Sequence, residues 1–200
     1  MSGQHLLPGT TLRERTAAAV ADSRLRTNVA RAVDRFASHR TTGLAELDDA
    51  DGLRRAARAA KQQVLADLPD LLERFADQVL ARGGDVCWAT TAEDAKSYIV
   101  GVVEAAGATR VAKSKSMATE EIDLNAALEA TGAEVVETDL GEWIIQLAGE
   151  TPSHIIAPAL HKDRHQIKDL FVDTVAAPAT LDTEPAELVG FARRRLREVF

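Results

Sequence analysis

The chain has 200 residues, of which 46% are hydrophobic and 28% are charged, and its formal net charge is -7 at pH 7. This balance is typical of one folded domain with an extension and argues against a disordered chain. The negative charge disfavours nucleic-acid binding, because neutralising phosphates requires a basic face. No stretch reaches the ~20 apolar residues of a membrane span, and Met1–Arg13 lacks an apolar signal segment, so we expect a cytoplasmic protein.

The N-terminal quarter predicts a helical extension. After a polar lead-in at residues 1–10, residues 11–40 are rich in arginine and carry a narrow apolar stripe at helical spacing, at Val29, Val33 and Phe36. A stripe of this kind docks on the chain's own domain or on a partner. Because its outer face is basic and the rest of the chain is acidic, we expect it to pack on another subunit or on a second copy of the chain, and the second case would give a homo-oligomer.

An acidic connection at residues 41–52 separates this extension, residues 1–50, from an α/β domain at residues 51–200. Helical spacing returns from Leu53 to about Arg82, where Pro69 predicts a break near Asp67 or Leu68, because proline is tolerated in the first turn of a helix but not in its interior. Two glycines then end the second helix.

Beyond Gly84, short apolar runs alternate with helical segments. Thr91 and Asp94 predict a capping box for the first of these helices, and Thr119 is expected to cap the second. The alternation indicates a βαβαβαβ order and a Rossmann-like parallel sheet. The four predicted strands are 85–89, 109–112, 133–137 and 154–157.

Two further helices are expected after the sheet, at 162–172 and at 184–200. The last one reaches Phe200 without a glycine, asparagine or proline stop signal. This pattern favours a chain that forms part of a longer protein, with an α/β domain that is incomplete at its C-terminus.

Polar side chains follow three of the apolar runs, where an open α/β sheet binds its ligands. They are Lys113, Ser114, Lys115 and Ser116, then Glu137, Asp139, Glu142 and Gln146, and finally His161 and Lys162. The lysines, the hydroxyls and a following helix start favour a carboxylate or phosphate ligand. The acidic groups would orient hydroxyl or amine groups, or balance the lysines.

Each of these groups also has a structural interpretation. The lysines could form a solvated edge, Asp139 and Glu142 could serve only the start of a helix, and Gln146 could be exposed. If the lysines bind an anion at the surface of the sheet, replacing Lys113 and Lys115 together should weaken binding and leave folding intact.

The sequence gives little support for a metal site or a nucleotide-binding site. Cys87 is the single cysteine of the sequence, so the chain is not expected to hold an iron–sulfur cluster, which takes four thiolates, and Cys87 itself is expected to be a small buried residue. His161 and His165 have metal-binding spacing, but Lys162 and Arg164 beside them would repel a cation, so no metal site is expected. Glycine-rich dinucleotide and phosphate loops are absent from the sequence.

A family resemblance adds to this interpretation. Residues 111–167 contain the phrases KSKSM, EEIDLN, VETDLGEWIIQL and PSHIIAPALHK, which together resemble the LUD domain of the lactate-utilisation protein B family. The resemblance implies a fold similar to the CoA-transferase and ribose-phosphate-isomerase group, and a role in oxidising L-lactate to pyruvate with two partner subunits. It also implies two [4Fe–4S] clusters in a later region of the full-length family members, whose cysteine motifs are not in this sequence.

Two other functions remain open. The first is a small-molecule enzyme or sensor that uses the same fold to bind an anionic substrate. The second is a non-catalytic module that docks partner subunits. No pair of residues stands out as an acid and a base, so the sequence does not identify catalytic residues.

Overall fold

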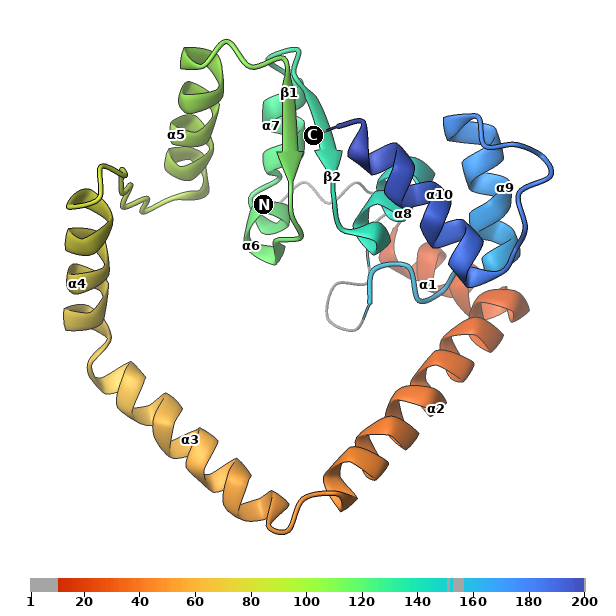
Figure 1. Cartoon of the computed structure of the whole chain (residues 1–200), viewed down its shortest axis with the longest axis horizontal. Helices are drawn as coiled ribbons and strands as arrows, with labels where there is room; N and C mark the ends of the chain where they lie inside the picture. Colours follow the sequence, from red (N-terminus) through yellow and green to blue (C-terminus); the bar gives the residue numbers. More distant parts are fainter. Residues whose placement is uncertain (1–10, 151, 153–156, 200) are drawn as a thin grey trace. The chain divides into compact units, whose positions relative to one another are not determined.

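The structure is a computed structural model that describes residues 11–150, 152 and 157–199 (Figure 1). These residues form ten helices and two strands. They fall into two compact units, one with the residues up to Ala32 and from Thr91 onward, the other with Val33–Thr90. These divisions differ from the boundary after residue 50 that the sequence suggests. Every helix in the described ranges is too short or too polar to cross a bilayer.

The Val33–Thr90 unit is entirely helical where it is regular. It contains the second part of α2 (Ser23–Ala45), then α3 (Ala50–Ala66) and α4 (Leu68–Leu80). Asp67 lies between α3 and α4 and proline occupies the first turn of α4, which confirms the predicted break. The acidic connection is shorter than expected, because α2 continues to Ala45 while its threonine hydroxyls bond to carbonyls within the helix.

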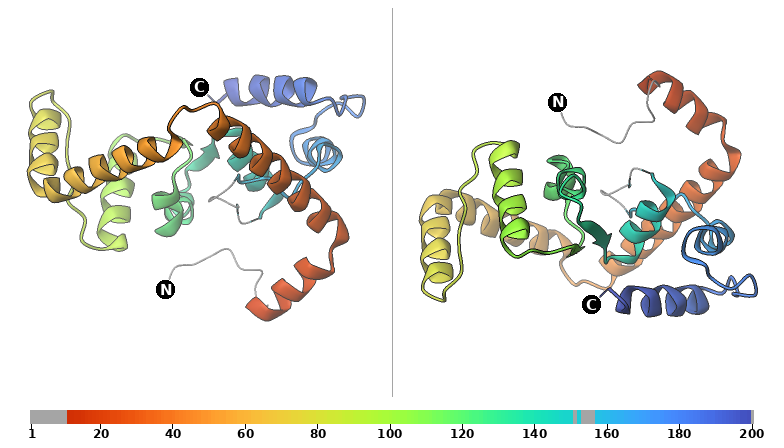
Figure 2. Two further views of the ribbon diagram at one scale, coloured as in Figure 1. Left: turned by 90° about the horizontal axis from the view of Figure 1, so that it is seen from below. Right: turned by 90° about the horizontal axis from the view of Figure 1, so that it is seen from above.

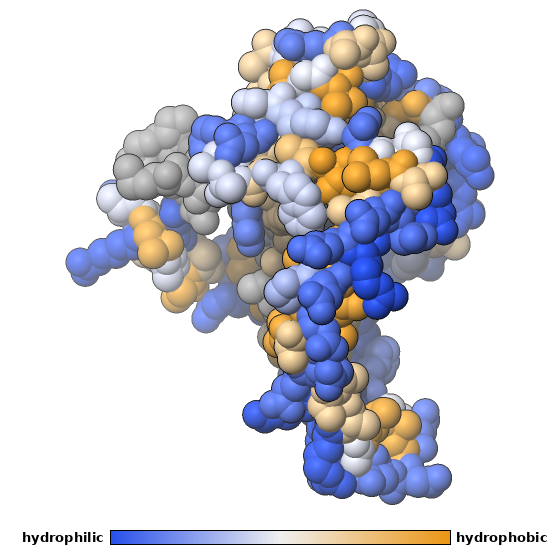
Figure 3. Space-filling view, turned by 90° about the vertical axis from the view of Figure 1, so that its left-hand side faces the viewer, coloured by the Kyte–Doolittle hydropathy of each residue, from blue (hydrophilic) through white to orange (hydrophobic). Residues whose placement is uncertain are grey.

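Large apolar side chains of α3 and α4 remain exposed. They include Leu53, Val64, Leu65, Leu72, Phe75 and Leu80. Figure 3 shows apolar side chains among hydrophilic ones on the face that it presents. Ala76 is the one buried residue of these two helices, so neither helix is held by a core within the described part of its unit.

The larger unit contains a parallel pair of strands. Strand β1 (Arg110–Lys113) pairs with β2 (Glu134–Glu137), and the two lie side by side in the views of Figures 1 and 2. The connection between them carries α6 (Met117–Glu121) and α7 (Leu124–Glu129). Parallel strands require a crossover of this length, so the order α5 (Ala92–Ala105), β1, α6, α7, β2, α8 (Leu140–Ala148) confirms an α/β protein.

The expectation of a strand at Asp85–Ala89 is wrong, because these residues are irregular. An apolar run becomes a strand only when a neighbouring strand takes its backbone hydrogen bonds, and none in the described part of the chain does so. Cys87 in this run is exposed rather than buried. The expected strand at 154–157 lies almost wholly outside the described residues. The described sheet therefore has two strands where the sequence predicts four.

The helix starts are confirmed in part. Thr91 and Asp94 form the expected capping box of α5, with Thr91 Oγ1 accepting from the Asp94 N–H at 3.1 Å. The next helix begins differently, since Ser116 caps α6 and Thr119 lies inside it. Asp123 adopts a left-handed conformation with φ 54°, which divides the expected single helix into α6 and α7.

The principal core of the larger unit lies between β2, α8, α9 (Arg164–Val175) and α10 (Pro185–Arg197). Phe171 is fully buried at its centre, with its ring 5.3 Å from that of Trp143 and 5.5 Å from that of Phe191. A smaller cluster of Leu124, Leu128 and Val135 packs α7 against the other face of the strand pair. Alternate residues of β2 thus face different clusters, as the period-two geometry of a strand dictates.

The first part of α2 docks on this unit. Arg24 makes a bidentate ion pair with Asp163, with Nε and Nη2 at 2.8 and 2.9 Å from the two carboxylate oxygens. Buried Asn28 donates to the His161 carbonyl at 3.0 Å. This part of the predicted extension therefore packs on its own chain, in contrast with the expectation of another subunit. Association through α1 (Leu12–Ala21) or the remainder of α2 stays a prediction.

The Arg24 guanidinium holds the pKa of the Asp163 carboxyl well below its usual range, and the N–H groups of Gln166 and His165 add to the effect. A lowered folded-state pKa stabilises the fold above the ordinary carboxyl pKa, and this stabilisation is lost as pH falls through the folded-state pKa. We expect Arg24→Gln to raise the Asp163 pKa, measured by NMR titration of the carboxyl carbon. Arg26→Gln on the same helix is the control, and an unchanged Asp163 pKa in Arg24→Gln would contradict the assignment.

Candidate functional site

The register of the two strands brings Lys113 and Glu137 together. They are partners at the carboxyl ends of β1 and β2. Lys113 Nζ lies 2.7 Å from Glu137 Oε1, and the two side chains are only 10% and 4% exposed. Two candidate residues from different runs thus form one buried ion pair at the edge of the sheet where ligands of α/β proteins bind.

Two residues that the sequence does not single out as site residues form hydrogen bonds with this ion pair. Lys113 Nζ donates to Thr119 Oγ1 at 3.0 Å, and Asn125 Nδ2 donates to Glu137 Oε1 at 3.0 Å. Thr119 belongs to α6 and Asn125 to α7, so the break between these helices places both side chains against the pair. The sequence carries no local signal for Asn125, because its role depends on where α7 packs.

Gln146 holds the end of β2 rather than facing solvent. Its Oε1 accepts from the Glu137 N–H at 3.0 Å and its Nε2 donates to the Val135 carbonyl at 2.7 Å. The side chain therefore supplies the hydrogen bonds that a neighbouring strand would make on this side of β2. Gln146 positions Glu137 through its backbone.

A second ion pair joins the segment after β1 to the first turn of α8. Lys115 Nζ is 3.8 Å from Glu142 Oε1, with the lysine side chain 34% exposed and the glutamate 2% exposed. Asp139 caps α8, since its Oδ1 accepts from the N–H groups of Gly141 and Glu142. The structural interpretation thus holds for Asp139, and Ser116 serves likewise as the cap of α6. Ser114 is exposed.

These four charged side chains, which we call the strand-end cluster, are Lys113, Lys115, Glu137 and Glu142. Their ion pairs mean that the two lysines are balanced by two buried carboxylates. Two unbalanced ammonium groups would attract any small anion, and the sequence already allows that the acidic residues balance the lysines. The observed arrangement leaves Lys115, which is the most exposed and the least closely paired, as the cation best placed to meet one.

His161 and Lys162 form a separate group with Glu150. His161 Nε2 and Lys162 Nζ lie 2.7 and 2.6 Å from its two carboxylate oxygens. Burial would raise the Glu150 pKa, but these two hydrogen bonds outweigh it and the pKa is lowered. The described contacts connect His161 and Lys162 to Glu150 rather than to the strand-end cluster. In the described residues, no three histidine, cysteine or acidic side chains converge as metal ligands.

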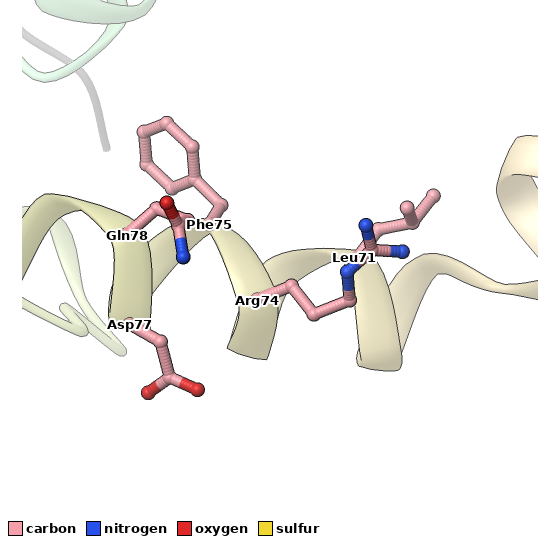
Figure 4. Close-up of a pocket in the computed structure, with 5 residues that line it drawn as sticks. All are labelled: Leu71, Arg74, Phe75, Asp77 and Gln78. Carbon is pink, nitrogen blue, oxygen red and sulfur yellow. The ribbon is translucent and has the colours of Figure 1, made fainter.

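A shallow hollow lies along α4, in the other unit. Leu71, Arg74, Phe75, Asp77 and Gln78 line it, and Figure 4 shows Phe75 and Asp77 on opposite sides of the helix. Because one helix supplies the whole lining, the hollow is a feature of an exposed helix surface. The strand-end cluster, which combines burial, charge and the carboxyl ends of parallel strands, is the candidate site.

The fold and this cluster define an α/β domain with a charged site at the ends of parallel strands. Comparison with known families is more specific, since the model of the LUD domain matches residues 72–200. The chain therefore belongs to the LUD domain family.

Curated relatives match over most of the chain. Lactate utilization protein B of Oceanobacillus iheyensis is 45% identical over 176 residues, covering 88% of this chain and 36% of that protein. The protein of the same name from Bacillus subtilis is 42% identical over 189 residues, covering 94% of this chain and 39% of the relative. The chain thus spans less than two fifths of the length of these relatives. No solved structure matches it.

Proposed function

We propose that this chain supplies the LUD domain of a lactate-utilisation protein, which takes part with partner subunits in the cytoplasmic oxidation of L-lactate to pyruvate. The observation that carries the proposal is the identity of 41–45% to proteins named Lactate utilization protein B over 88–94% of the chain. Identity of this extent and length supports a shared fold and a related role.

Electron transfer through iron–sulfur clusters would fall to other residues of such an assembly. A [4Fe–4S] cluster takes four thiolates, and Cys87 is the single cysteine of this sequence. These residues therefore do not fit a cluster. The contribution of this domain is to bind and position, either a small ligand or a partner subunit.

We further propose that the domain has a fold of the CoA-transferase and ribose-phosphate-isomerase type and binds a small carboxylate at the strand-end cluster. The parallel pair β1–β2, its helical crossover and a charged group at the carboxyl ends of both strands support this. The same cluster favours a ligand-binding enzyme or sensor as the second candidate function, in place of a pure docking module.

A chimeric protein tests the role in lactate utilisation. In Bacillus subtilis, the region of Lactate utilization protein B that aligns with this chain would be replaced by this chain. We expect growth on L-lactate as sole carbon source to be retained, because the domain supplies the same contacts. Deletion of the region is the control and should abolish growth. A chimera that accumulates to normal levels without supporting growth would refute the proposal.

Lys115→Gln tests the carboxylate site in the purified chain. Because Lys115 is the more exposed lysine and its carboxylate partner lies 3.8 Å away, its removal should leave the fold intact. We expect the Kd for L-lactate to rise about tenfold, equivalent to about 1.4 kcal/mol, by calorimetric titration. Lys61→Gln on α3 is the control and should bind as the wild type does. If the wild type, Lys115→Gln and Lys61→Gln bind L-lactate with equal affinity, Lys115 is not part of the site.

A further inference from the structure

Two buried oxygen atoms of the strand-end region lack hydrogen-bond partners in the described part of the chain. They are Glu137 Oε2 and Asn125 Oδ1. Glu137 as a whole is 3% exposed, so water does not compensate its carboxylate from the surface. A buried acceptor without a donor is destabilising, and functional sites are where such atoms persist.

Both atoms are acceptors, and their neighbours already donate elsewhere. Lys113 Nζ and Asn125 Nδ2 both approach Glu137 Oε1, the other oxygen of the carboxylate. The Asn125 amide cannot be reversed, because its oxygen would then face that carboxylate oxygen. The backbone N–H of Glu137 is occupied by Gln146. What these two atoms require is therefore an additional hydrogen-bond donor.

We propose that Glu137 Oε2 and Asn125 Oδ1 are the acceptors for a hydroxyl or ammonium group of the ligand, with a hydroxyl donating to one of them and an ammonium group to both, while Lys115 pairs with the carboxylate of the same molecule. The inference rests on the proposed function for the presence of a carboxylate ligand, and it adds which carboxylates are selected. Glu137 and Asn125 become the specificity-determining residues. Lys115 is the more exposed of the two lysines, so it is the cation that a ligand arriving from solvent would meet.

This arrangement distinguishes small carboxylates by the substituent that each one places against the two acceptor oxygens. An ammonium group can donate to both acceptors, and a hydroxyl can donate to one of them. A keto oxygen in the same position can only accept, so it faces two acceptor oxygens, and a hydrogen atom leaves both of them unsatisfied. Sites built around a hydrogen bond to a ligand reject the analogue that lacks it, because the protein groups then stay buried and unpaired.

The test compares four probes that share a three-carbon carboxylate: L-lactate, L-alanine, pyruvate and propionate. Titration calorimetry on the whole chain should give L-lactate and L-alanine a Kd at least tenfold lower than those of pyruvate and propionate. Asn125→Leu removes one of the two acceptors that the ammonium group of L-alanine can use, and it should reduce the ratio of the propionate Kd to the L-alanine Kd to within about threefold. The matched control is Gln62→Leu on the exposed face of α3, which should keep the wild-type ratio.

The outcomes separate this inference from the function on which it rests. If the four probes bind equally to the wild type, the carboxylate site stands and the assignment of Glu137 and Asn125 is overturned. If none of the four probes binds, the proposed carboxylate site itself is refuted. If Asn125→Leu does not fold, as judged by circular dichroism, the order of the four Kd values on the wild type decides whether the inference holds.

Discussion

Replacing Lys113 with methionine is expected to lower the free energy of unfolding by about 3–5 kcal/mol. The lysine is 10% exposed and its partner Glu137 is 4% exposed, so the change leaves a carboxylate buried without its cation. From the sequence, the two lysines of the KSKS segment look equivalent, and their joint replacement is expected to leave folding intact. The structure overturns this for Lys113, because its ammonium group lies between the strands and α6 rather than in solvent.

Urea unfolding of two further variants checks this interpretation. Lys115→Met should lower the free energy of unfolding by less than about 1 kcal/mol, because its pair is longer at 3.8 Å and the lysine side chain is 34% exposed to solvent screening. Lys113→Met combined with Glu137→Leu should recover most of the loss, since replacing both members of a buried pair by apolar groups is often neutral. Equal losses for Lys113→Met and Lys115→Met would show that the first pair is not buried in solution.

Phe171→Ala should also lower the free energy of unfolding by about 3–5 kcal/mol, as Lys113→Met does, because it empties the centre of the principal core. The ring is 0% exposed and contacts the rings of Trp143 and Phe191, on α8 and α10. Its removal leaves a cavity between three helices that are each held by this cluster. Unfolding followed by tryptophan fluorescence measures the loss, since Trp143 lies against the cavity.

Phe75→Ala is the matched control. Phe75 is 63% exposed on α4, so its replacement should change stability by no more than about 0.5 kcal/mol. The exposed Trp88 contributes a nearly constant fluorescence signal in both variants. A loss in Phe75→Ala comparable to that in Phe171→Ala would mean that α4 packs against a surface that these contacts do not show.

Much of the candidate site follows from the sequence. The runs at 109–112 and 133–137 become β1 and β2 within one residue, because each run is short and follows a glycine that ends the preceding helical segment. Polar residues directly after them must then meet at one edge of a parallel pair. Lys113 and Glu137 could be placed together on this basis, whereas their burial as an ion pair could not.

The remaining site residues depend on distant parts of the chain. Asn125 reaches Glu137 only because Asp123 adopts φ 54° and separates α7 from α6. Gln146 contacts β2 because α8 folds back along the strand. His161 and Lys162 follow a predicted strand, yet their described partner is Glu150. None of these contacts has a signature within a few residues of sequence.

By itself the sequence determined the local features of this protein: the capping box at Thr91, the break before Pro69 and the end of α4 ahead of Gly83 and Gly84. Each depends on side-chain and backbone preferences that act within about four residues. Tertiary structure decided that residues 85–89 are not a strand, that Cys87 is exposed and that Lys113 is buried. The physical reason is that strand pairing, burial and charge compensation depend on which distant segments pack together, and that information is not local.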